Sequence, residues 1–254
     1  MKSLKIHVKE SIFDDVEDIV NDDTVLIEQF LKDNYEIDGS YGINGNVVNV
    51  KGHVKVKNKN IESFTNGLFQ FGKVSGGFSC SGCLNLKSLN GAPEKVDMWF
   101  NCYKCDELIS LEGAPKRVRG NFDCSRCENL KSLKGAPEKV GGDFNCVACD
   151  KLTTLEGSPK EVSRDFYCNN CINLTSLKGA PKKIGGGFSC CFCSKLTSLE
   201  GAPEKVKDIF WCSGCTNLKS LKGAPEEVGG YFWCDDCKNL TITDQDREKY
   251  KIKG

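Results

Sequence analysis

The apolar positions of this chain recur every 22 residues, without insertion or deletion, over roughly two thirds of its length. One unit reads V-G-G-D-F-N-C-V-A-C-D-K-L-T-T-L from Val140 to Leu155 and closes with E-G-S-P. All seven prolines lie in the matching G-[AS]-P turn. So strict a period predicts stacked repeats in which each unit packs on its neighbours. The repeated phenylalanines are Phe78, Phe100, Phe122, Phe144, Phe166, Phe188, Phe210 and Phe232.

Within each unit, the spacing of the apolar residues predicts a short strand. Residues two apart lie on the same face of a strand, so Phe and the first Cys face one way and the residues between them face the other. Gly and Pro interrupt the remaining residues, which leaves a return leg too short and broken for a helix. Stacking predicts one long parallel sheet with non-helical return legs. In the unit around residue 144, the interior positions are Phe144, Cys146, Cys149, Leu152, Leu155 and, on the return side, Val162, and the exterior positions are Asp143, Asn145 and Val147.

The flanking segments lack the repeat and are expected to cap the stack. Residues 1–40 contain no cysteine and begin with an apolar alternation at Leu4, Ile6 and Val8. A helix of about three turns is then expected to cover the open end of the array, because terminal repeats need capping. Its candidate N-cap residues are Asp22, Asp23 and Thr24, and its apolar positions are Leu26, Ile27, Phe30 and Leu31.

Residues 41–73 are expected to form strands and a degenerate first repeat. Val54, Val56, Ile61 and Phe64 echo the interior series without its cysteines. Eight regular coils follow over residues 74–243, and residues 244–254 form a C-terminal cap in which Asp244 begins a short helix.

The phrase F-x-C-x-x-C-x-x-L-x-x-L resembles the leucine-rich repeat. In this resemblance Phe144 and Cys146 take interior strand positions, and Cys149 takes the Asn/Cys ladder position. More narrowly, L-x-S-L-x-G-A-P-x-x-V-G-G-x-F-x-C is similar to short-repeat proteins encoded by tailed bacteriophages and prophages. The resemblance implies a right-handed leucine-rich-repeat solenoid and a viral protein, and it implies little about activity.

Composition narrows the classes of partner. Lys plus Arg and Asp plus Glu both total 35, so the net charge is zero. This balance argues against nucleic acid or an anionic membrane as partner. The first residues lack the apolar core of a signal peptide, so we expect a cytoplasmic protein, in the host cytoplasm if phage-encoded, whose thiols are reduced.

The C-x-x-C pairs admit three interpretations. Strand alternation turns both cysteines inward as small apolar residues, so we favour buried free thiols and no cofactor. The alternatives are a zinc or iron–sulfur array built from successive pairs and disulfides within each repeat. Cys191 lies on the outward side and is the best candidate for an exposed thiol. The paired cysteines are Cys80, Cys83, Cys102, Cys105, Cys124, Cys127, Cys146, Cys149, Cys168, Cys171, Cys190, Cys193, Cys212, Cys215, Cys234 and Cys237.

The exterior columns vary between coils and gather aromatic residues toward the C-terminal end. Exposed Trp and Tyr clusters mark interaction sites, although stacked aromatics also stabilise sheets unaided. Asp123, Asp143 and Asp165 are also expected near one another, where a solvated face is favoured over acid–base or Ca²⁺ chemistry. The predicted partner-binding residues are Tyr167, Ile209, Trp211, Tyr231 and Trp233.

We therefore expect a non-enzymatic scaffold that presents its sheet to a protein partner, such as a host factor. A virion structural component and a metal-binding cysteine array are the alternatives.

Overall fold

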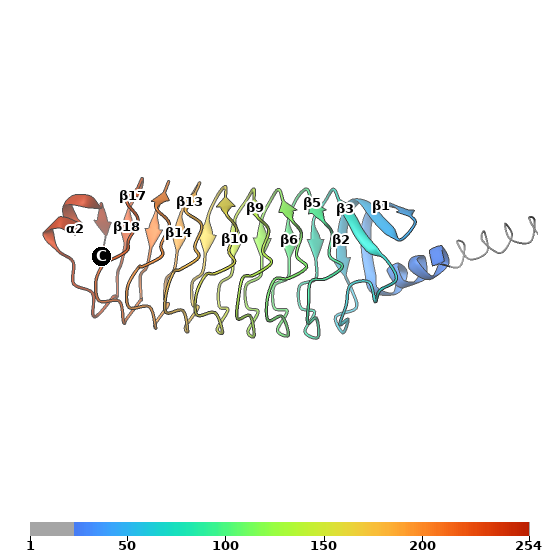
Figure 1. Cartoon of the computed structure of the whole chain (residues 1–254), viewed down its shortest axis with the longest axis horizontal. Helices are drawn as coiled ribbons and strands as arrows, with labels where there is room; N and C mark the ends of the chain where they lie inside the picture. The colour runs from blue at the N-terminus through green and yellow to red at the C-terminus, as the bar shows by residue number, and fades with distance from the viewer. Residues whose placement is uncertain (1–22, 254) are drawn as a thin grey trace, which may run out of the picture.

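The computed structural model describes residues 23–253, which form an elongated parallel β-solenoid (Figure 1). Successive coils are stacked along the long axis, with a helix at the N-terminal end and helix α2 (Asp244–Lys249) at the other. The 19 strands of residues 23–253 belong to one sheet, in which all pairings are parallel except that of the first two of these strands. The predicted parallel sheet and non-helical return legs are confirmed.

Each regular coil contributes two short strands. The first ends at the repeated Val or Ile, and the second, a few residues later, carries the repeated Phe. Lys139–Val140 (β9) and Phe144–Asn145 (β10) are the pair in the unit introduced above. The first column consists of β3 (Gln70–Val74), β5 (Lys95–Val96), β7 (Arg117–Val118), β9, β11 (Glu161–Val162), β13 (Lys183–Ile184), β15 (Lys205–Val206) and β17 (Glu227–Val228). The second consists of β4 (Phe78–Ser79), β6 (Phe100–Asn101), β8 (Phe122–Asp123), β10, β12 (Phe166–Tyr167), β14 (Phe188–Ser189), β16 (Phe210–Trp211), β18 (Phe232–Trp233) and β19 (Ile252–Lys253).

The strands of the first column differ from the expectation from sequence, which assigned their apolar residues to the return side of the coil. Val162 was expected on the return side, but it lies in β11 and pairs with Val140 and Ile184 in the same sheet. The reason is visible in strand β2 (Val47–Val56), which pairs with β3 through its first half and with β4 through its second. Each later coil thus carries an interrupted copy of β2, broken by the residues between its two short strands.

The interior is built from side chains that pack on their own copies. Phe144 pairs in register with Phe122 and Phe166, with ring centroids 5.4 and 5.2 Å apart and nearly parallel planes. All eight repeated phenylalanines are fully buried. The columns of Leu and Val are buried as well, except that Val228 and Leu240 in the last coil are half-buried, so the coils before it contribute the same cross-section to one continuous core.

The turn glycine of each return leg is required by backbone conformation and by space. Gly157 has a φ of +91°, and a Cβ atom built on it would lie 2.3 Å from the backbone nitrogen of Lys134 in the preceding coil. Any other residue would therefore be strained and would push the coils apart.

The N-terminal cap is a helix followed by a hairpin. Residues 23–34 are helical, and Ile27 and Leu31 are buried against the first coils as predicted. Leu26 is instead 48% exposed, so the buried stripe is narrower than expected. Strand β1 (Tyr35–Asn44) then pairs antiparallel with β2.

Two of the proposed helix caps are wrong, since Asp23 and Thr24 already lie within the helix. Asp22 and the alternating Leu4, Ile6 and Val8 lie outside the described residues. The degenerate first repeat buries its apolar positions as predicted, namely Val54, Val56, Ile61 and Phe64.

The C-terminal cap closes the other end. Helix α2 begins at Asp244 as predicted, and the Thr243 side chain caps it by accepting a hydrogen bond from the Asp246 N–H. Tyr250 is buried against Phe232 and donates a hydrogen bond from its hydroxyl to the Pro225 carbonyl at 2.6 Å. Strand β19 then adds a last rung beside β18, which covers the edge that the final coil would expose.

Candidate functional site

The cysteines form two interior columns whose thiols bond to the backbone. Fifteen of the sixteen paired cysteines are buried, and Cys237 in the last coil is half-buried. The first Cys of a pair donates to a carbonyl of the next coil, as Cys146 does to Tyr167 at 3.4 Å. The second donates to the backbone carbonyl of the first Cys in the preceding coil, as the Cys149 thiol does to the Cys124 carbonyl at 3.3 Å. The second donor column comprises Cys105, Cys127, Cys149, Cys171, Cys193, Cys215 and Cys237.

Burial keeps most of these thiols protonated. It raises the pKa of the Cys146 thiol well above the usual value, and a hydrogen bond with the Cys171 thiol adds to the effect. Within residues 23–253, no three His, Cys, Asp or Glu side chains are arranged to hold a metal ion. All the cysteines are free thiols in this structure.

Two thiols differ from the rest. Cys191 faces outward as predicted and is half-buried, with Sγ 3.5 Å from the Ser189 hydroxyl, and burial raises its pKa. Cys237 is the opposite case, since hydrogen bonds, first of all that with the Cys212 thiol, lower its pKa. The repeat pattern does not distinguish Cys237 from its copies, because only its place in the last coil exposes it.

The exterior face near the C-terminal end carries an aromatic patch, which we define as Ile209, Trp211, Tyr231, Trp233 and Phe192. Trp211 and Trp233 pair in register on adjacent strands, and the Tyr231 and Trp233 rings meet edge to face at 6.3 Å. The ammonium group of Lys253 lies 5.2 Å above the Tyr231 ring. The structure thus brings together three of the predicted partner-binding residues, and Ile209 lies half-buried directly before strand β16, which contains Trp211.

We include Phe192 in this patch because its N–H donates to the carbonyl of Ser213, two residues beyond Trp211 in the next coil; the strand pattern did not single it out. It is 54% exposed and has a φ of +58°, a left-handed conformation that is costly for a bulky residue. Its ring lies over Gly214 of the next coil. The signal in the sequence is an aromatic residue at a position where the other coils have Gly82, Lys104, Arg126, Ala148, Asn170, Gly214 and Asp236, all with positive φ.

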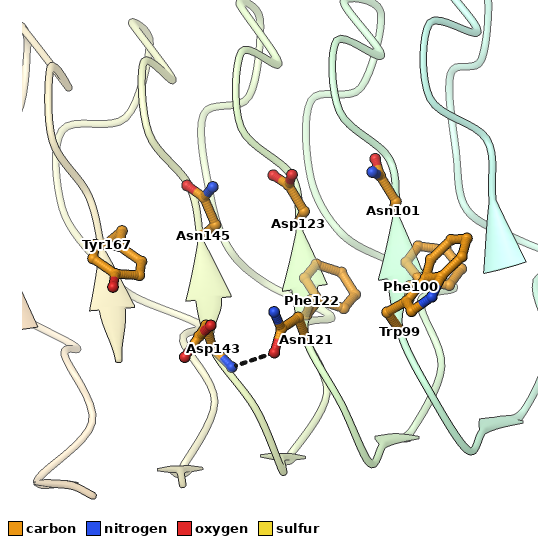
Figure 2. A pocket seen from close by; sticks show the side chains of 9 residues that line it. All are labelled: Trp99, Phe100, Asn101, Asn121, Phe122, Asp123, Asp143, Asn145 and Tyr167. Carbon is orange, nitrogen blue, oxygen red and sulfur yellow. Dashed lines mark hydrogen bonds between the residues drawn. The ribbon is translucent and has the colours of Figure 1, made fainter. Parts of the chain in front are cut away.

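Tyr167 lies apart from the patch and closes a groove nearer the N-terminal end (Figure 2). Its hydroxyl donates to Asp165 at 2.7 Å, and burial followed by this hydrogen bond raises its pKa to about 12. At the other end, Trp99 lies flat against Gly77 and stacks on His53 with ring centroids 5.8 Å apart. We call this the polar groove; it has a volume of about 250 Å³ and is lined by Trp99, Phe100, Asn101, Asn121, Phe122, Asp123, Asp143, Asn145 and Tyr167.

The three acidic residues predicted to lie near one another, Asp123, Asp143 and Asp165, each accept a hydrogen bond from a backbone N–H. Asp143 accepts a hydrogen bond from the Asp165 N–H at 3.2 Å, and Asp165 accepts one from the Gly187 N–H at 2.6 Å. Asp123 instead accepts from the N–H and the hydroxyl of Ser125 in its own coil. Asp143 and Asp165 therefore link adjacent coils, whereas Asp123 fixes a turn within its own coil. Asp123 and Asp143 also line the polar groove.

Comparison with protein-family models, with curated proteins and with solved structures gives no match. Among residues 23–253, no helix has both the length and the apolar composition needed to cross a membrane.

Proposed function

We propose that this protein is a non-enzymatic scaffold that binds a protein partner through the aromatic patch. The observation that carries the proposal is the clustering of Trp211, Trp233 and Tyr231 on the outer face of the adjacent strands β16 and β18. Trp and Tyr supply large contact areas at low entropic cost and dominate the energetics of many interfaces.

Phe192 supports this assignment because its aromatic ring is 54% exposed at a turn where the other coils have small or polar residues. A left-handed conformation costs a non-glycine residue about 1–2 kcal/mol. The equivalent residues of the other regular coils also have positive φ, so what distinguishes Phe192 is the exposed apolar ring at this turn. Lys253 above the Tyr231 ring places a positive charge beside the patch, which suits a partner with an apolar centre and an acidic rim.

The finer assignments are proposals of the same kind. The cysteine ladder to the preceding coil is what the leucine-rich-repeat resemblance implies for the position of Cys149. On that basis we propose a repeat protein of the phage-encoded kind that acts in the host cytoplasm on a host factor. Incorporation in a virion is the competing role, and a metal-loaded cysteine array is the competing chemistry.

The test replaces Trp211 and Trp233 with Ser. Serine is native at this exterior position in other coils, as Ser79 and Ser189, so the double variant is expected to fold. Wild-type and variant proteins are used as parallel baits in cell extracts, and any protein retained by the wild type alone is then titrated against both. We expect the double substitution to weaken binding at least 100-fold.

Trp99→Asn is the matched control, because Asn121 occupies the same position in the next coil. It removes an outward tryptophan far from the patch and is expected to leave partner binding unchanged. Equal retention by the wild type and the Trp211/Trp233 variant would contradict the proposal. A purified protein that contains about one zinc per two coils would favour the metal array instead.

A further inference from the structure

The polar groove combines rigid aromatic ends with a floor of amides and carboxylates. It crosses strands β6, β8, β10 and β12, so its length is three strand spacings, or about 14 Å. Figure 2 shows Asn101, Asp123 and Asn145 in one row, with Asn121 and Asp143 in a second row, between Trp99 and Tyr167. The lining side chains other than the interior phenylalanines are half-buried or exposed, and therefore reachable by a ligand.

The floor residues are each held by one atom and leave another for a ligand. The Oδ1 atoms of Asn101 and Asn145 accept backbone N–H groups two residues on, at 2.8 and 3.0 Å. The Oδ1 atom of Asn121 accepts the Asp143 N–H at 2.9 Å. These bonds fix each amide, so its Nδ2 donors are identified and preoriented.

The remaining atoms have no protein partner within residues 23–253. They are the Nδ2 donors of Asn101, Asn121 and Asn145 and the Oδ2 acceptor of Asp123. Preoriented groups bind with little loss of side-chain entropy. The groove therefore presents donors interleaved with an acceptor at the spacing of the strands.

Each aromatic end is held by contacts within the protein. A Cβ atom at Gly77 would lie 2.2 Å from the Trp99 ring, so the indole can pack directly on the backbone only because this residue is glycine. The Trp99 ring also stacks on the His53 ring, which restricts its orientation further. The Tyr167 ring is held by its hydrogen bond to Asp165.

We infer that the polar groove binds a neutral oligosaccharide of about three pyranose units, a length that follows from the strand spacing. Sugar hydroxyls both donate and accept, which matches a floor of amide donors and a carboxylate acceptor. The C–H face of a pyranose is apolar and packs on the electron-rich face of an aromatic ring. Each sugar unit spans a length close to one strand spacing, so successive units meet successive coils.

Charge and topology disfavour other occupants. Asp123 repels nucleic acid and acidic glycans, which carry their own negative charges, whereas the charge of Asp143 is partly offset by the Nε atom of Arg164 at 3.7 Å. A peptide that adds to a sheet needs a free strand edge, but β6, β8, β10 and β12 are each paired on both sides. This site is separate from the aromatic patch and does not depend on the function proposed for it.

The experiment titrates the full chain with neutral trisaccharides, using cellotriose, triacetylchitotriose and maltotriose as probes and tryptophan fluorescence and calorimetry as readouts. We expect saturable binding of at least one probe. Trp99→Asn is expected to weaken it at least 10-fold, whereas Trp211→Ser/Trp233→Ser leaves it unchanged. Circular dichroism checks that each variant keeps its fold.

Asn145→Ser provides a second variant that keeps the local turn, because Ser79 makes the equivalent bond to the N–H two residues on. It removes only the Nδ2 donor and is expected to weaken binding about 3- to 10-fold. Tyr167→Phe keeps the ring and is expected to lose less than Tyr167→Ser. The inference is overturned if no neutral trisaccharide saturates the protein, if Trp99→Asn binds as the wild type does, or if an acidic trisaccharide or a peptide binds the groove more tightly.

Discussion

Phe210 and Trp211 are neighbours in strand β16 and are both large aromatic residues, but they serve opposite sides of the sheet. Phe210 is fully buried between its copies Phe188 and Phe232, with ring centroids 5.3 and 4.9 Å away. Trp211 is half-buried and lies between Ser189 and Trp233. The interior side chain repeats because it packs on its own copy, and the exterior one varies because solvent imposes no such match.

This contrast predicts its largest effect in the phenylalanine column. Phe144→Ala removes a ring stacked on both sides and leaves a cavity that neither neighbouring coil can fill. The free energy of unfolding should fall by about 3–5 kcal/mol, measured by urea denaturation followed by circular dichroism. The adjacent exterior change Asn145→Ala should cost no more than about 1 kcal/mol. Similar losses for the two variants would show that the coil interior is not the main source of stability.

The cysteine columns should show an intermediate effect. Cys149→Ala removes both a buried thiol and its hydrogen bond to Cys124, and we expect a loss of about 1–3 kcal/mol. Cys149→Ser keeps a hydrogen-bond donor and should therefore lose less stability than Cys149→Ala. If Ser were no better than Ala in the same denaturation assay, the thiol would contribute packing alone.

Substitution of Phe192 should increase the free energy of unfolding, in contrast to the substitutions above. Phe192→Gly relieves the left-handed strain, and after the greater flexibility of glycine in the unfolded chain is counted, stability should rise by about 1 kcal/mol. Partner binding through the aromatic patch should weaken in the same variant. Ala148→Gly, at the equivalent position, is the control that should stabilise without affecting binding. A destabilised Phe192→Gly variant would mean that the ring is structural.

The smallest effect is one of reactivity without a change in fold. A disulfide-exchange reagent added to native protein should modify Cys237 quickly and Cys191 slowly, and the other thiols only under denaturant. Because hydrogen bonding lowers the pKa of Cys237 and burial raises that of Cys191, a rise in pH from 7 to 9 should accelerate Cys191 more. Cys237→Ser should remove the fast phase, and a fast phase that persists would place the reactive thiol elsewhere.

The sequence predicted the interior better than the exterior. Strand alternation correctly turned Phe144 and Cys146 inward, and the ladder position of Cys149 anticipated a bond from its thiol to the backbone. The same alternation identified Trp211 and Trp233 as outward neighbours. It grouped Tyr167 with them, whereas the structure places Tyr167 at the polar groove with Trp99.

The misplaced or missed residues have local causes. Val162 lies in the sheet because the interrupted strand before it continues the path of β2, and no periodicity in one coil reveals that path. Phe192 was missed because it lies in the turn after the strand, outside the exterior strand columns; its backbone conformation is shared with its copies, and its aromatic side chain sets it apart.

By itself, the sequence determined the coil, since a 22-residue period with Phe, Cys, Leu and Val at constant spacing can bury these side chains only by stacking each on its own copy. Tertiary structure decided which exterior residues act together. A column of outward side chains becomes a groove or a patch according to the direction in which each ring lies, and that direction is set by contacts across coils. Gly77 beneath Trp99 and Gly214 beneath Phe192 are those contacts, and each joins residues 22 positions apart, which are neighbours only once the coils are stacked.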